Sequence, residues 1–192
     1  MNFRLYDILA QIIPGFLVYL SYIDLLGKSW DNNFALPATV IAFIIGYFIN
    51  ALASWFENFY YWTWKGKPSN RLIEGFSIKK VRFYSSNQAK ELLISETNNP
   101  APTSDELFSI AMRYANSDKF PRVHTFNESY AFSRVILTTL ILSFLILSFK
   151  YYHSAYFWTT FPILLAASWQ RCKERAYYFA KEVLQSYLKE KT

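Results

Sequence analysis

The sequence predicts an all-α, polytopic membrane protein with four transmembrane helices and a small, mainly helical cytoplasmic domain. Its first ground is a set of four apolar segments, at 5–26, 35–64, 135–152 and 156–169. A helix needs about 20 mostly apolar residues to cross the hydrocarbon core of a bilayer. The first two segments reach that length, the third needs its aromatic flank to span, and the fourth is the shortest.

The second ground is the distribution of basic residues. Of the twenty Lys and Arg residues, Lys28 and Lys150 lie in the short loops between paired segments. The other eighteen comprise Arg4 and the residues of the middle region and the C-terminal tail. Because cytoplasmic loops carry an excess of Lys and Arg, we expect a multi-pass protein of the cell inner membrane with both termini in the cytoplasm.

The third ground is composition. Aromatic residues make up 20% of the chain, and short polar gaps separate long apolar runs, which disfavours a soluble domain. The first segment carries Asp7 and lacks a small-x-small cleavage site, so we expect a retained span rather than a cleaved signal peptide. The single cysteine, Cys172, excludes an intramolecular disulfide and a multi-cysteine metal site.

Four parts follow along the chain: a first transmembrane hairpin (1–64), a basic cytoplasmic domain (65–133), a second hairpin (134–169) and a cytoplasmic helical tail (170–192). The middle region, with Arg134 included, holds eleven basic and seven acidic residues. This positive charge suits a surface that lies against anionic membrane lipids. The charges are dispersed and no recognition motif accompanies them, which disfavours nucleic acid as a partner.

In the first segment, Pro14-Gly15 predicts a kink, which acts either as a hinge or as a packing bend. The second segment carries small and polar residues at intervals of four, which we expect to form one stripe on a helix: Ala38, Ala42, Gly46, Asn50, Ser54 and Asn58. Small residues let helices approach closely, and Asn can hydrogen-bond across the contact. The stripe therefore predicts either packing against the first segment or a homo-oligomer.

The second segment ends in an aromatic belt, 55–64, of the kind found at the membrane surface. Glu57 lies within this belt. A carboxylate buried at membrane depth is a functional candidate. Near the lipid headgroups, a solvated or Lys-paired Glu57 is the favoured interpretation.

The middle region predicts short elements. Segment 77–85 is compatible with a strand or an interfacial stretch, and Ser86-Asn87 can cap a helix that runs through Ile94. Residues 98–102 break the chain. Thr103-Ser104-Asp105-Glu106 has the form of a capping box, and apolar residues follow it on helical spacing.

The last two segments predict helices that extend beyond the membrane. Phe120-Pro121 breaks the preceding helix, and a second capping box, Thr125 to Glu128, predicts that the third span begins near 125 and continues to about 152. The fourth segment continues past Pro162 into the tail without a breaking residue. These extensions and the middle region would form a small cytoplasmic bundle.

The sequence carries no catalytic motif, so we expect no enzyme activity, no cofactor and no metal site. Basic and polar residues before the third span are candidate contacts for a cytoplasmic ligand or for lipid headgroups: Arg113, Arg122, His124 and Arg134. A hydrated cluster at headgroup level is the favoured interpretation, and a nuclease or a phosphate site is the alternative.

Two short motifs, Tyr6-Asp7-Ile8-Leu9 and Ile13-Pro14-Gly15-Phe16, resemble the start of small multi-pass membrane proteins of bacterial antiphage defence systems. Phe126-Asn127-Glu128, followed by Arg134, adds to the resemblance. It covers about a fifth of the chain. It implies an effector whose assembly is driven by a cytoplasmic sensor or second messenger, with loss of membrane integrity.

Three functions remain open. The first is an oligomeric membrane effector, or the membrane subunit of a defence complex, that responds to a soluble partner protein or a nucleotide signal. The second is a non-catalytic anchor that recruits a soluble partner. The third, a small transporter or membrane enzyme, is disfavoured because the spans hold few polar residues.

Overall fold

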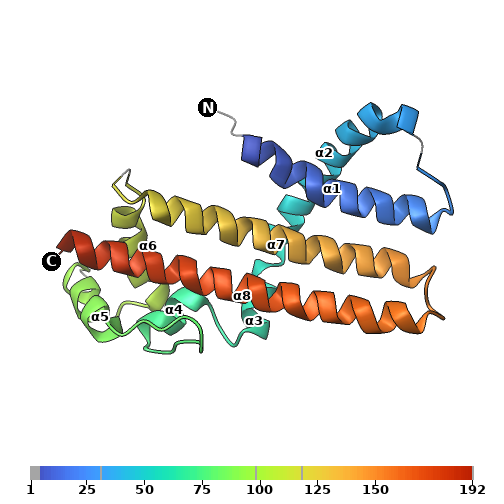
Figure 1. The fold of residues 1–192 in the computed structure, drawn as a ribbon. Coiled ribbons are helices and arrows are strands. Elements are labelled where there is room, and N and C mark those ends of the chain that lie inside the picture. The colour runs from blue at the N-terminus through green and yellow to red at the C-terminus, as the bar shows by residue number, and fades with distance from the viewer. Residues whose placement is uncertain (1–4, 31, 98, 118, 192) are drawn as a thin grey trace. The chain divides into compact units, whose positions relative to one another are not determined.

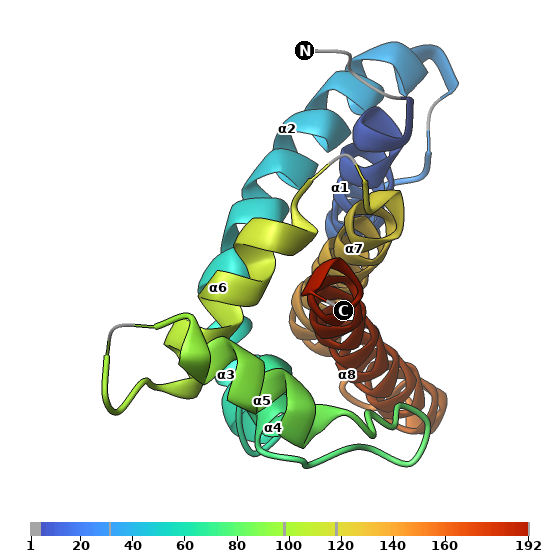
Figure 2. The same cartoon turned by 90° about the vertical axis from the view of Figure 1, so that its left-hand side faces the viewer.

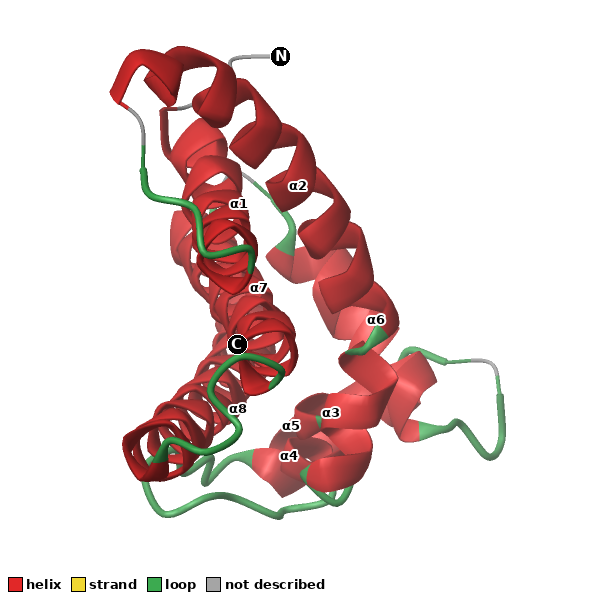
Figure 3. Cartoon of the chain, turned by 90° about the vertical axis from the view of Figure 1, so that its right-hand side faces the viewer, coloured by secondary structure: helices red, strands yellow, loops and turns green. Residues whose placement is uncertain are grey.

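All the named elements of the computed structural model are helices (Figures 1 and 3). The structure describes residues 5–30, 32–97, 99–117 and 119–191, so Arg4 lies outside the described residues. The helices are α1 (Leu5–Leu25), a short 3₁₀ helix (Asn32–Phe34), α2 (Ala35–Trp55), α3 (Glu57–Thr63), α4 (Pro68–Ile73), α5 (Ser86–Ser95), α6 (Ser104–Ala115), α7 (Pro121–Ser148) and α8 (Ala155–Lys191).

The chain forms two compact units. The first, here called the apolar unit, comprises residues 1–57 and 132–170. The second, here called the polar unit, comprises residues 58–131 and 171–192. Both α7 and α8 therefore contribute residues to each unit.

Three helices are long and apolar enough to cross a membrane: Ile8–Leu25 in α1, Ala35–Trp55 and Pro121–Ser148. They correspond to the first three apolar segments, and the predicted all-helical class is confirmed. The fourth segment lies inside α8, a helix of 37 residues. Its apolar stretch is short because Gln170, Arg171 and Lys173 follow Trp169 at once, and α8 is not among the three helices that meet the length and hydropathy requirement.

Within the apolar unit, α1 packs along α2, and α7 joins them through Val135, which is buried with Ile49 and Ala53. The Lys150 ammonium, just after α7, lies 2.8 Å from the Asp24 carboxylate near the end of α1. This ion pair brings the C-terminal ends of α1 and α7 together, so the two helices run in the same direction. Phe144 of α7 stacks on Phe157 of α8.

Two predicted helix boundaries are wrong. The segment 35–64 is not one helix, because α2 ends at Trp55 and α3 begins at Glu57. Glu57 lies in the first turn of α3, where the partial positive charge of a helix N-terminus favours a carboxylate. The predicted capping box at Thr125 lies inside α7, which begins at Pro121 and ends at Ser148. Proline suits the first helical position because its missing N–H would have no partner there.

Other local predictions for the polar unit can also be compared. The capping box at Thr103 is confirmed: its hydroxyl accepts from the Glu106 N–H at 3.3 Å, and the Glu106 carboxylate accepts from the Thr103 N–H at 2.8 Å. Helix α5 begins at Ser86 as expected, although its N-cap residue, Ser85, makes no side-chain capping bond. Segment 77–85 forms no regular strand, but a turn closed by an isolated bridge between Ile78 and Val81.

The core of the polar unit lies where α4, α5 and α6 meet the C-terminal part of α8. Helices α4, α5 and α6 lie next to one another (Figure 2). From α8, Tyr177, Ala180, Leu184 and Tyr187 enter the core at intervals of three and four residues, which is the spacing of one helix face. Full burial of a leucine-sized side chain contributes about 1.5–3 kcal/mol.

Candidate functional site

The first part of the predicted stripe packs inside the chain. Ala38, Ala42 and Gly46 are buried against α1. A Cβ atom on Gly46 would lie 1.9 Å from the Gln11 carbonyl oxygen, and one on Gly15 would lie 1.7 Å from the Ala42 carbonyl oxygen. Pro14 is buried beside Gly15, so the observed packing favours the packing bend over the hinge.

The second part of the stripe leaves this contact. Asn50 and Ser54 are exposed on the apolar unit, and Asn58 is exposed on the polar unit. The reason is helical pitch: a step of four residues turns a helix by about 400°, so each step drifts by about 40°. Three steps from Ala38 rotate Asn50 by about 120° away from α1. The buried line continues instead through Ile49 and Ala53.

A polar cluster forms in the apolar unit around the C-terminal end of α2. The Arg134 guanidinium of α7 lies 2.6 Å from the Glu57 carboxylate. It also donates to the Ser54 hydroxyl at 3.2 Å, and that hydroxyl donates to the Asn50 carbonyl at 3.3 Å. The Arg134 side chain is 13% exposed and the Glu57 side chain 29%. Glu57 is thus paired, but the expectation of a Lys partner or a solvated carboxylate is wrong.

Buried hydroxyl groups of α7 are satisfied locally. Thr138 donates to the Arg134 carbonyl at 3.0 Å, and Thr139 donates to the Val135 carbonyl at 2.8 Å. Such bonds to the preceding turn let Thr lie in an apolar helix without a polar partner on another helix. These two residues therefore add no element of a polar pathway.

The four residues proposed as ligand or lipid contacts lie in different surroundings. Arg113 is exposed on α6 and lines an open pocket. Arg122 lies 3.4 Å from the Glu182 carboxylate, with its guanidinium 5.8 Å from the centre of the Phe126 ring. His124 is exposed on α7, and Arg134 belongs to the apolar unit.

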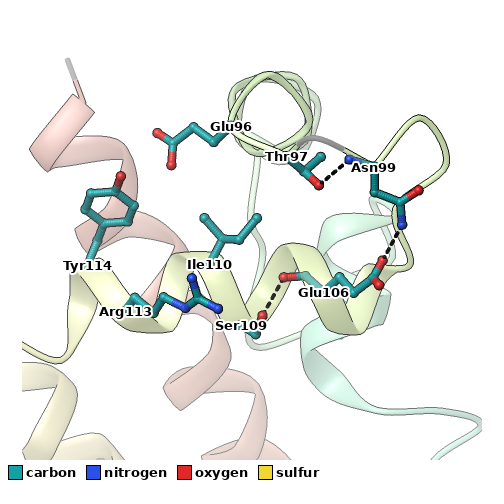
Figure 4. Close-up of a pocket in the computed structure, with 8 residues that line it drawn as sticks. All are labelled: Glu96, Thr97, Asn99, Glu106, Ser109, Ile110, Arg113 and Tyr114. Carbon is teal, nitrogen blue, oxygen red and sulfur yellow. Dashed lines mark hydrogen bonds between the residues drawn. The ribbon is translucent and has the colours of Figure 1, made fainter.

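The pocket that Arg113 lines has a volume of about 570 Å³ (Figure 4). Helix α6 provides Glu106, Ser109 and Ile110, with Tyr114 one turn further on, and the end of α5 and the following loop provide the opposite side. Its lining residues are Glu96, Thr97, Asn99, Glu106, Ser109, Ile110, Arg113 and Tyr114.

Both carboxylates of this pocket already have partners. Glu106 closes the capping box and accepts from the Asn99 amide at 3.2 Å. Glu96 accepts from the Tyr187 hydroxyl at 3.1 Å and lies 2.6 Å from the Lys191 ammonium. The positive charge of Arg113 is therefore the feature of the pocket that could attract an anionic ligand, since guanidinium groups pair with phosphate and carboxylate.

The partners of Glu96 shift two pKa values. Burial opposes ionisation of Glu96, but its hydrogen bonds with Lys191, Tyr114 and Tyr187 outweigh this effect and lower its pKa. Burial, with the charge of Glu96, raises the pKa of Tyr187 to about 12. This network ties the end of α8 to α5 and α6. Sequence spacing gave no signal for it, because Glu96 and Tyr187 are 91 positions apart.

Comparisons with protein-family models, curated proteins and solved structures find no match to this chain. Among the described residues, no group of three or more His, Cys, Asp or Glu side chains is placed to hold a metal ion. The site must therefore be interpreted from its own geometry.

Proposed function

We propose that this chain is an integral membrane effector, or the membrane subunit, of a bacterial antiphage defence complex. It spans the inner membrane four times with both termini in the cytoplasm, oligomerises through its spans, and responds to a cytoplasmic signal by permeabilising the membrane. Parallel α1 and α7, which the Lys150–Asp24 ion pair indicates, support this topology because both would leave the cytoplasm in the same direction.

The observation that carries the proposal is the exposed Asn50 of α2. Its exposed neighbours on this helix, Tyr47 and Phe48, are aromatic, and the next turn toward the N-terminus exposes Ile44. An amide that faces hydrocarbon lacks hydrogen-bond partners, whereas an amide on another transmembrane helix can provide them. Since α1 already covers Ala38 and Gly46, a second copy of the chain would pack on the Asn50 face.

Two features support a response to a cytoplasmic signal. The pocket of Arg113 could bind a nucleotide phosphate or an acidic partner segment. Helices α7 and α8 each have residues in both units, so a change that binding causes in the polar unit acts on elements that continue into the apolar unit.

The proposal is tested by replacing Asn50→Leu. We expect lower oligomeric mass in detergent and loss of membrane depolarisation when the protein is induced together with its genomic neighbours. Interhelical hydrogen bonds contribute about 0.6–2 kcal/mol each, so each contact should weaken about 3- to 30-fold. Ile44→Leu, on the same helix, should leave both properties unchanged. A monomeric wild-type protein, or wild-type expression that never depolarises cells, would contradict the effector function.

The alternative function is a membrane anchor that recruits a soluble protein. It is favoured by the loop between α4 and α5, where Tyr84 is 84% exposed beside the basic residues Lys79 and Arg82. An exposed aromatic residue among cations is typical of protein interfaces. Stoichiometric recovery of a soluble partner by the wild-type protein, but not by Tyr84→Ala, would support the anchor.

A further inference from the structure

The polar unit holds a group of cations at the turn that follows α3. Lys65 adopts a left-handed conformation with φ +64°, and Gly66 follows with φ +123°. The Arg71 guanidinium lies across this turn and donates from Nη1 to the carbonyls of Trp64 at 3.3 Å and Lys65 at 3.1 Å. The turn therefore fixes the position of the guanidinium.

Helix α8 brings a third cation to the same place. Tyr177 packs in the core with Leu72 and Ile73 of α4, and its hydroxyl is hydrogen-bonded to Arg71. Lys173 precedes Tyr177 by one helical turn and so lies on the same side of α8. Burial lowers the pKa of Lys173, and the positive charges of Arg71 and Lys65 lower it further. The three cations thus lie within electrostatic range of one another.

Nearby carboxylates are paired with other cations. Asp105 lies 2.9 Å from the Lys67 ammonium, and Glu174 lies 2.8 Å from the Lys80 ammonium. The Arg71 Nε is buried and has no hydrogen-bond partner among the described residues. Cations held close together repel one another, and an anion that accepts from all three relieves the repulsion.

We propose that Lys65, Arg71 and Lys173 bind the phosphate group of an anionic phospholipid headgroup. A guanidinium matches a phosphate with two parallel hydrogen bonds, and the two ammonium groups add point charges. The site is distinct from the pocket of Arg113 and from the Asn50 face.

The position of the site in the chain favours a lipid over a soluble phosphate. Lys65 follows α3, whose Trp62 is 75% exposed and stacks with Phe59. Exposed Trp and aromatic side chains that directly follow a span lie at headgroup depth. Lys173 follows the fourth apolar segment by four residues. This step depends on the proposed topology, in which both segments end at the cytoplasmic face, where basic sites bind lipid headgroups.

The test measures thermal unfolding of the full chain in dodecyl maltoside with three additives: phosphatidylglycerol, phosphatidylcholine and soluble glycerol phosphate. We expect phosphatidylglycerol alone to raise the Tm, by at least about 2 °C. An equal shift with phosphatidylcholine would overturn the proposal. A shift with glycerol phosphate as large as that with the lipid would replace the lipid with a soluble phosphate as the ligand.

Two variants locate the site. Lys173→Gln should raise the Tm without lipid, because it removes the repelled charge, and should abolish the shift with phosphatidylglycerol. Lys65→Asn should also abolish the shift while keeping the left-handed turn, which Asn tolerates. Lys189→Gln, an exposed position on α8, is the control and should keep the full shift. An undiminished shift in both Lys173→Gln and Lys65→Asn would overturn the proposal.

These outcomes are separate from those of the proposed function. Lipid binding is measured without a signal, a partner or depolarisation, and the Asn50→Leu experiment does not depend on Lys173. A failure of either experiment leaves the result of the other intact.

Discussion

At the scale of single residues, the contact of α1 with α2 depends on two glycines. The positions that a Cβ on Gly15 or Gly46 would occupy are taken by backbone atoms of the facing helix, at 1.7 and 1.9 Å. A side chain at the contact could rotate away, but a backbone carbonyl cannot move without shifting its helix. The two helices can therefore adopt this packing only with glycine at both positions.

We expect Gly46→Ala to lower the free energy of unfolding by about 1–3 kcal/mol, which is typical of overpacking. The effect is measured by thermal unfolding in detergent. Ala166→Val adds two methyl groups at an exposed position of α8 and should leave the Tm nearly unchanged. Equal stability of Gly46→Ala and the wild type would show that α1 and α2 do not pack in this register.

The ion pair of Arg134 and Glu57 provides a second residue-scale prediction. Replacement of either partner leaves the other charge in a largely buried position, which costs about 1–3 kcal/mol. Glu57→Gln and Arg134→Gln should each destabilise the protein, and the double variant should lose less than the sum of the two. Unfolding of all four proteins in a double-mutant cycle measures the coupling. Additive losses would contradict a direct interaction.

At the scale of elements, local signals in the sequence predicted the helices better than their boundaries. Two four-residue motifs of the same form predicted capping boxes, at Thr103 and at Thr125, and the first caps a helix. The second is inside α7, where Thr125 instead donates to the Pro121 carbonyl at 3.3 Å. The proline four residues earlier begins the helix, and a motif considered alone does not include that competing signal.

The confirmed capping box allows a calibrated prediction. Thr103→Ala should reduce stability by about 1 kcal/mol, because the first turn of α6 loses its side-chain acceptor. Ser109→Ala, on the exposed side of the same helix, should change stability by less than about 0.5 kcal/mol. Chemical denaturation resolves the difference. If the two variants lost equal stability, the cap would not contribute to the folded state.

At the scale of the whole molecule, periodicity and charge predicted the class of fold, but not which distant residues meet. The link of Glu96 to Lys191 and the group of Lys65, Arg71 and Lys173 join segments far apart in the sequence. Packing of α8 on α4, α5 and α6 creates both. Neither segment carries a local pattern that identifies its partner.

The link of Glu96 predicts a dependence of stability on pH. Because the folded state lowers the pKa of Glu96 below 4.5, its contribution to stability is complete above that pH and is lost as pH falls through the folded pKa. Wild-type stability should therefore fall more steeply below about pH 4.5 than that of Glu96→Gln. Glu91→Gln, at an exposed position of α5, should follow the wild-type profile. Parallel profiles for all three would contradict the network.

The topology is the last prediction, and labelling of single cysteines from outside the cell tests it. Cys172 is fully buried, and a Cys172→Ser background removes its thiol. With four spans, His153→Cys, in the loop between α7 and α8, should react with an impermeant maleimide in intact cells. Asn87→Cys and Gln185→Cys should react only after the membrane is opened, because eighteen of twenty basic residues place these regions inside.

The same experiment decides between four spans and three. The three helices that are long and apolar enough to span would leave α8 outside the membrane if the segment 156–169 did not cross. In that case, Gln185→Cys and His153→Cys would lie on one side and react together. That segment is bounded by the aromatic Tyr156 and Trp169, which suit the two membrane surfaces, and Arg171 and Lys173 follow. We therefore expect Gln185→Cys to stay protected, which would require the fourth segment to cross despite its shortness.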